Sequence, residues 1–322
     1  MTVRIYSSSD AGAPVLRGNT PGDLINLLEK CLVTGYGSKA GAGWTKPYTG
    51  TNVAAFQQGA GSNGMFLRID DTSTATSYRS ARMKGYEAMT DVNTGTPTSF
   101  PTPTQSANGV YWFTHYSSGS VANPRPWRIV ADEMFFYFML STYPENNDSN
   151  YFYNECYAFG DIIPYKPGDT THTVLLGSWS VNSPNTSESY PWQGVSISSY
   201  MGSNRYVLLA ARSYTNLGGP IFLGWHSDHT KGSSTWGSGN LMYPHGPDGG
   251  LYLAPVWVHE AHVSPYSVRG TMPGLWVPCH MDGVFSQYQT FNGQGELAGK
   301  QFMARRHYNA AVCFEISDTW DR

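Results

Sequence analysis

The sequence is poor in charged residues. Asp, Glu, Lys and Arg make up 13% of the 322 residues and the formal net charge is −3, whereas an average soluble domain is about 25% charged. The basic residues form no stripe that would follow a phosphate backbone. We therefore expect no nucleic-acid partner.

Long apolar runs and paired cysteine motifs are also missing. The longest apolar run covers residues 134–140, far short of the roughly 20 residues of a membrane helix. The first residues lack the basic start and apolar stretch of a signal peptide. We expect no membrane partner. Cys31, Cys156, Cys279 and Cys313 are widely spaced without a CxxC, so they are predicted to be reduced packing residues.

One segment has a helical pattern. Thr20 supplies an N-cap hydroxyl, and a proline and an acidic residue follow in the first turn. The apolar residues then recur at helical spacing, and Gly35 stands where a left-handed C-cap is favoured. The pattern predicts a helix over residues 20–34, with one buried stripe formed by Leu24, Leu27, Leu28, Cys31 and Leu32.

The rest of the chain is typical of strands and turns, because the whole sequence combines 35 glycines and 20 prolines with 14% aromatic residues. Two hairpins are predicted, one joining 53–56 to 65–69 and one joining 127–130 to 134–140, whose second strand is apolar on both faces. Further strands are expected at 110–115, 151–159, 173–179, 206–211, 221–225, 251–259 and 312–316. The predicted fold class is mainly β, with sandwich-like antiparallel sheets, one N-terminal α-helix and long loops.

A possible boundary lies near residues 143–150, where a polar, proline-containing stretch interrupts the strands. It would separate an N-terminal β domain (1–145) from a second β-rich region (146–322). The alternative is that both regions belong to one domain.

Four histidines offer a candidate metal site: His226, His229, His259 and His262. Within each pair the histidines are three residues apart, whereas the helical zinc motif places them four apart. We interpret them as hydrogen-bonded loop histidines and predict no metal or other cofactor. A metal-dependent hydrolase stays an alternative, as does a carboxylate-based one that would use Asp70 and Asp71 with Asp132 or Glu133.

Aromatic residues suggest contacts of another kind. Exposed rings would stack on sugars, although core packing and subunit contacts are the more common uses of Trp and Tyr. The candidates are Trp112, Trp179, Trp192, Trp225, Trp236 and Tyr243.

Three long polar or glycine-rich loops are predicted to be ordered by neighbouring subunits, at 35–45, 95–105 and 232–250. In the first, Gly41 and Gly43 would let a mobile loop present Trp44 as an anchor, and Trp236 would play the same part in the last. The alternative is that Trp44 only covers the core of the first hairpin. Residues 269–274 are interpreted as either a tight turn or a docking loop.

Several segments together resemble a family of virion structural proteins of tailed bacteriophages. These segments are residues 10–16, 31–37, 39–45, 66–71, 85–89, 125–132 and 269–278. The resemblance implies a non-enzymatic particle component that contacts other virion proteins and copies of itself, located in the virion after assembly in the host cytoplasm. It leaves head, neck and tail open, and a receptor- or glycan-binding appendage protein that contacts host surface glycans is the alternative.

Overall fold

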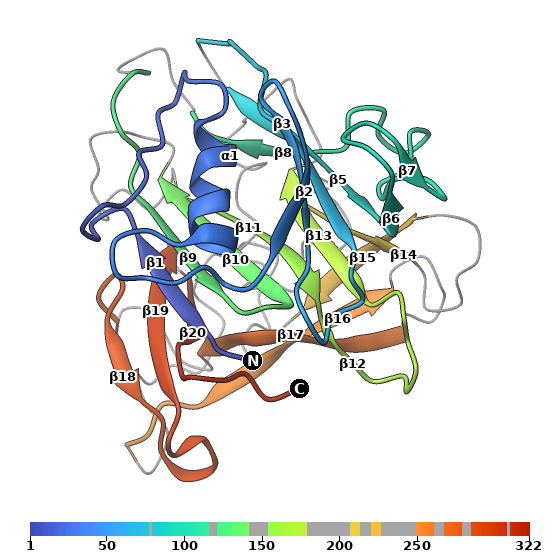
Figure 1. The fold of residues 1–322 in the computed structure, drawn as a ribbon. Coiled ribbons are helices and arrows are strands. Elements are labelled where there is room, and N and C mark those ends of the chain that lie inside the picture. Colours follow the sequence, from blue (N-terminus) through green and yellow to red (C-terminus); the bar gives the residue numbers. More distant parts are fainter. Residues whose placement is uncertain are drawn as a thin grey trace.

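The computed structural model describes residues 1–76, 79–115, 121–141, 154–178, 207–212, 220–226, 249–260, 267–278, 285–307 and 310–322. Within these residues the chain is mainly β, as predicted, with a short helix near the N-terminus (Figure 1). The strands pair antiparallel, and they form three packed layers.

The first layer consists of strands from the N-terminal third of the chain. In order of pairing these are β2 (Thr45–Gly50), β3 (Val53–Gln57), β4 (Phe66–Asp70), β5 (Ser80–Tyr86) and β8 (Val110–Phe113). A small separate hairpin joins β6 (Ala88–Met89) to β7 (Gly95–Thr96). The predicted hairpin around residues 59–64 is therefore confirmed as β3–β4.

The middle layer begins with β1 (Arg4–Ser7) and contains the second predicted hairpin. Its strands pair in the order β1, β9 (Trp127–Ala131), β10 (Phe135–Ser141), β11 (Asn154–Asp161), β13 (Thr173–Ser178), β14 (Val207–Arg212), β15 (Pro220–His226) and β16 (Leu253–Glu260). At Ser178, β13 also meets Tyr111 of β8, which links the first two layers.

The third layer is built on the long strand β17 (Ser267–Pro278), which pairs with β16 and with the short β12 (Ile163–Pro164). The ladder continues from β17 to β20 (Ala310–Glu315), β19 (Gln301–His307) and β18 (Thr290–Asn292). A 3-10 turn, η5 (Gly295–Leu297), lies in the connection between β18 and β19.

Strand β10 separates two apolar cores. Phe136, Phe138 and Leu140 point into the core that contains the helical stripe, whereas the intervening Tyr137 and Met139 belong to the core against the third layer. Successive side chains of a strand point to opposite faces, so a strand buried on both sides must be apolar throughout. Figure 1 shows the result: green middle strands between blue and red layers. The prediction that this strand is central is confirmed.

The helix is shorter than predicted. Helix α1 covers Asp23–Leu28 and continues as a π-helical segment, η1 (Glu29–Thr34). Gly22, with φ 87°, is the N-cap, so Thr20 lies outside the helix. A side chain from elsewhere caps it instead: Asp71 Oδ2 accepts from the amides of Gly22 (2.8 Å) and Leu24 (3.2 Å). The stripe itself is confirmed, because its five side chains are fully buried in one core.

Two of the three predicted loops form backbone hydrogen bonds within the chain. Residues 35–45 pair within the chain: Ala42 N donates to Cys31 O and Trp44 N to Leu32 O, both at 3.0 Å, and Tyr36 bridges to Lys39. Residues 95–105 include β7 and the bridge between Phe100 and Gly85. Neither loop needs a neighbouring subunit for these backbone bonds. Of 232–250, only the last two residues are described.

Residues 269–274 form neither a turn nor a docking loop, because they lie within β17. Gly274 has φ 61° there, and a Cβ at this position would meet the Trp320 ring, which explains the glycine without a turn. The proposed boundary near 143–150 falls outside the described residues. The strands on either side pair over the full length of β10, and the division into domains stays a prediction.

Candidate functional site

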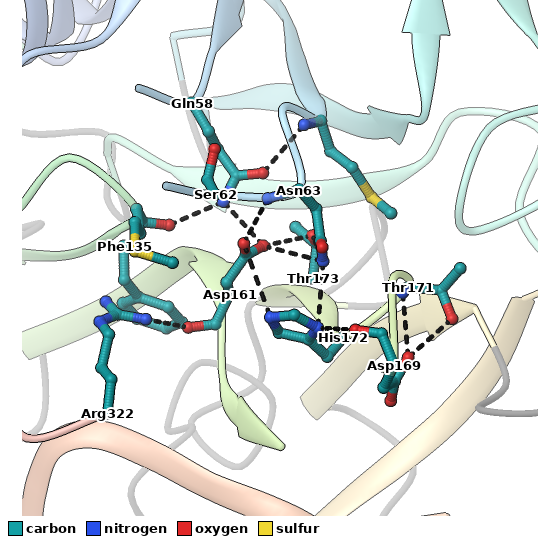
Figure 2. Close-up of polar contacts among 12 residues, drawn as sticks. Gln58, Ser62, Asn63, Phe135, Asp161, Asp169, Thr171, His172, Thr173 and Arg322 are labelled. Carbon is teal, nitrogen blue, oxygen red and sulfur yellow. Dashed lines mark hydrogen bonds and ion pairs between the residues drawn. The ribbon is translucent and has the colours of Figure 1, made fainter. Parts of the chain in front are cut away.

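The densest polar cluster is centred on Asp161, at the end of β11 (Figure 2). This fully buried carboxylate accepts hydrogen bonds from Gln58 Nε2 (2.8 Å), the amide of Asn63 (2.7 Å) and Thr173 Oγ1 (2.5 Å). The donors come from both ends of the β3–β4 connection and from β13. Asp161 therefore fixes the 59–64 loop of the first layer onto the middle layer.

His172 lies at the edge of this cluster. Its Nε2 is 3.7 Å from Asp161 Oδ2, and its Nδ1 contacts the carbonyl oxygen of Asp169 and, at 3.3 Å, Asn63 Nδ2. Ser62, the nearby hydroxyl, bonds instead to Gly59 O (2.6 Å) and accepts from Gly64 N (3.0 Å). The hydroxyl is thus engaged in its own loop, which is a turn geometry and no nucleophile–base pair.

A second cluster joins the β12–β13 connection to β17. Arg269 binds Asp169 through Nε (3.0 Å) and NH2 (3.2 Å), and its NH1 lies 3.3 Å from Glu260 Oε1. Burial acts to raise the pKa of Asp169, but the hydrogen bonds and charge of Arg269 outweigh it and hold that pKa below its usual range. All three side chains are buried. This ion cluster therefore connects segments of the fold, and a substrate could not reach it.

The turn between β9 and β10 holds both ends of the chain. Asp132 Oδ1 accepts from the amides of Met134 (2.8 Å) and Phe135 (2.7 Å), and Arg322 binds the same carboxylate at 2.9 Å. Next to it, Glu133 accepts from the amide of Thr2 at 3.0 Å. The two termini consequently meet at one hairpin, as Figure 1 shows.

Asp71 is the other carboxylate considered for catalysis, and it forms a fully buried ion pair with Arg79 at 2.5 Å. Burial raises the pKa of Asp71 to about 6, partly offset by the Arg79 charge. The carboxylate is therefore ionised at neutral pH and is occupied by Arg79 and by the two helix amides. Asp70 accepts from Thr72 N (3.2 Å) in its own turn. Within the described residues, these strand-end carboxylates thus bind amides and arginines.

The tryptophan of the predicted anchor lies inside the fold, whereas Gly41 is partly exposed and Gly43 is exposed. Trp44 is 2% exposed, donates Nε1 to Asp132 O (2.8 Å) and packs edge-on against Phe136. A Cβ on Gly41 would lie 2.2 Å from Val33 O, and Gly43 has φ 90° beside Glu133. The anchor hypothesis for Trp44 is wrong and the core alternative holds, because the loop has to pass close to the helix end.

The structure describes only some of the other predicted contact residues. Trp112 is fully buried and stacks on Tyr157 with ring centroids 5.1 Å apart, so its expected exposure is wrong. Trp225 lies in β15, where only the backbone is described. Trp236, Trp179, Trp192 and Tyr243 lie outside the described residues.

The histidines are only partly described. In backbone register His226 is opposite Trp257, and His259 is opposite Gly224 on the same strand pair, β15–β16. His229 and His262 lie outside the described residues. No group of three His, Cys, Asp or Glu side chains suited to a metal ion occurs in the part of the chain that the structure describes. Cys31, Cys156 and Cys313 are free and buried there, and Cys279 lies outside it.

An exposed apolar surface was not predicted from the sequence. Tyr165 is 54% exposed and Val268 is 42% exposed. Tyr165 N donates to the carbonyl oxygen of Arg269 (2.8 Å), the residue that follows Val268 in β17. Trp257 Nε1 donates to Tyr165 OH at 3.2 Å, and Tyr252, 46% exposed, leads into the same strand β16. We call Tyr165, Trp257 and Val268 the outer apolar surface; Tyr252 lies near the opposite end of β16 from the residue paired with Val268. In the sequence, Lys166 and Pro167, which follow Tyr165, are the local sign that this segment is not core.

The interior clusters gave a weaker sequence signal. Asp161 follows an apolar strand, and Asp169 stands in a Pro-Gly-Asp turn, which indicates strand ends but not their partners. None of the helices in the described part of the chain is long and apolar enough to cross a membrane. A scan against protein-family models and a search of curated proteins found no match.

Proposed function

We propose that this chain is a structural component of a tailed-bacteriophage virion and acts through contacts between subunits. The outer apolar surface is the observation that carries the proposal. Exposed large apolar side chains that gather on neighbouring strands are typical of protein–protein interfaces, whereas single exposed ones are normal. The resemblance of several sequence segments to virion structural proteins supports the same conclusion.

The polar interior favours a structural over a catalytic role. Asp71, Asp132, Asp161 and Asp169 each bind backbone amides, an arginine or both. Buried carboxylates held in this way connect layers, termini and loops. The proposal accordingly includes no catalytic residue and no cofactor. Its proposed location is the virion, with other virion proteins and copies of itself as partners.

The test is incorporation into particles. Mass spectrometry of gradient-purified virions produced from the genome that encodes this chain should find it at a fixed ratio to the other structural proteins. The variant Tyr165→Asp/Val268→Asp should keep the parental melting temperature and be incorporated at least tenfold less. Val15→Asp is the matched control, since Val15 is 41% exposed but lies outside the outer apolar surface. Absence of the chain from virions would contradict the proposal.

One observation favours a second candidate, a glycan-binding role. The hydrogen bond from Trp257 fixes the orientation of an exposed tyrosine ring, and fixed exposed rings with a polar edge suit stacking on sugars. Binding to a glycan array that is lost in Tyr165→Ala, with incorporation into virions unchanged, would move the function of this surface from assembly to host recognition.

A further inference from the structure

We infer that strand β18 is a homotypic pairing edge, at which two copies of this chain join their third-layer sheets antiparallel about a two-fold axis through Phe291. The inference rests on the proposed assembly role and names one contact for it. Strand β18 is the end of the ladder β17–β20–β19–β18, and among the described strands it pairs with β19 alone. Figure 1 shows it at the lower left margin of the molecule.

The hydrogen-bond pattern decides which backbone groups point outward. Ala304 N donates to Gln289 O, and Gly293 N donates to Lys300 O, both at 2.8 Å. In an antiparallel pair every second residue bonds to the partner strand. Gln289, Phe291 and Gly293 therefore face β19, and the N–H and C=O groups of Thr290 and Asn292 point to the free edge, where both residues are exposed.

These outward groups are self-complementary. If a second β18 lies antiparallel with Phe291 opposite Phe291, Thr290 of each copy is opposite Asn292 of the other. Both residues then form the closely spaced type of pair, in which N–H and C=O are exchanged in both directions. The Phe291 ring already stacks on Phe285 and Phe302, with centroids 5.2 and 5.5 Å apart, so the strand is held rigidly for pairing.

Charge favours a second copy as the occupant. The stretch from Gln287 to Gly295 contains no charged residue, so two identical edges meet without like-charge repulsion. An acidic or basic partner would find no complementary charge on this edge. Strand addition to an exposed sheet edge is a common mode of protein association.

Two other terminal strands of the described ladders, β2 and β1, are protected. Strand β2 contains Pro47, which has no N–H, an irregular register between Thr45 and Tyr48, and Lys46 paired with Glu29. At β1, Lys39 Nζ donates to Ile5 O (2.7 Å), and just before the strand Val3 N donates to Asp318 O (2.8 Å). Proline, lysine, irregular register, coverage and a very short strand are the usual protections of sheet edges. Of these, the described residues give β18 only the last, since it spans three residues.

The test uses sedimentation velocity of the full chain over a range of concentrations. The parent should show a monomer–dimer equilibrium. Thr290→Lys/Asn292→Lys and Thr290→Glu/Asn292→Glu should each raise the dimer dissociation constant at least tenfold, because like charges then lie opposite one another. An equimolar mixture of the two variants should restore the dimer as a heterodimer. Thr49→Lys, on the exposed edge of β2, is the control and should behave as the parent does.

A parent that stays monomeric would overturn the inference, as would a dimer that all four β18 substitutions leave unchanged. The proposed function is tested separately, because Tyr165→Asp/Val268→Asp leaves β18 intact. Loss of incorporation into virions with an unchanged dimer would support both ideas. If a β18 variant is monomeric yet fully incorporated, the dimer is not needed for particle assembly, although the chain is still a component of the virion.

Discussion

At the scale of single residues, buried acceptors determine how loops are attached. Asp161 receives its hydrogen bonds from donors that belong to two layers, and removing the carboxylate would leave Gln58 Nε2, Asn63 N and Thr173 Oγ1 buried with one partner fewer. We expect Asp161→Ala to lower the free energy of unfolding by about 3 kcal/mol. Asp318→Ala, at an exposed position, should change it by less than about 0.5 kcal/mol. Urea denaturation of both proteins measures the difference, and equal losses would show that the cluster does not stabilise the fold.

A second residue governs the response to acid. Burial, with Arg125 and Arg79 close by, lowers the pKa of His115 to about 4, whereas the unfolded chain has a histidine pKa of about 6.5. The unfolded state therefore binds more protons between these values, and stability falls as the pH falls through that interval. His115→Gln cannot titrate, so relative to the parent it should gain up to about 3 kcal/mol between pH 6.5 and pH 4.

The parent has to be compared with the His115→Gln variant because Asp71 changes stability in the opposite direction over the same pH range. The pKa of Asp71 is raised to about 6. Its protonation is favoured in the folded state, so its contribution to stability increases as the pH falls. Both proteins contain Asp71, and the difference between their unfolding curves removes it. A difference that does not change with pH would show that His115 titrates normally.

At the scale of elements, the apolar stripe of α1 is the feature that the sequence predicted best, because helical spacing alone identifies its buried face. Leu28 is fully buried against the first layer, and an unpaired carboxylate there would cost several kcal/mol. Leu28→Asp should yield no soluble, cooperatively melting protein. Asn26→Asp, on the exposed side of the same helix, should melt as the parent does. A folded Leu28→Asp protein would show that the helix is dispensable for the core.

The same element shows where sequence reasoning fails. Thr20 is a residue type that favours the N-cap position. The distant Asp71 nevertheless caps the helix through a tertiary contact, and no local sequence pattern predicts such a partner. Strand β17 was missed because its glycines and proline are typical of turns, while its irregular pairing with β16 accommodates them. Trp44 was placed on the surface because flanking glycines suggest mobility. In the structure they permit close packing instead.

At the scale of the whole molecule, strand β10 contributes side chains to two cores, as its neighbours β9, β11 and β13 also do. Neighbouring residues of one strand face different cores: Phe138 packs with Trp112 in the first, and Met139 belongs to the second. If both cores depend on this strand, they unfold together. The chain should then show one cooperative transition over all described layers, with the same midpoint by tryptophan fluorescence and by circular dichroism.

Two adjacent truncations test this coupling. Phe138→Ala and Met139→Ala each open a cavity at a fully buried position and should each lower the free energy of unfolding by about 3 kcal/mol. Both should shift the same single transition, although the cavities lie on opposite faces of the sheet. Two transitions, with Phe138→Ala moving one and Met139→Ala the other, would instead mean that the layers on either side of β10 are separate folding units. The domain boundary predicted near residues 143–150 would then correspond to a border between two units that unfold separately.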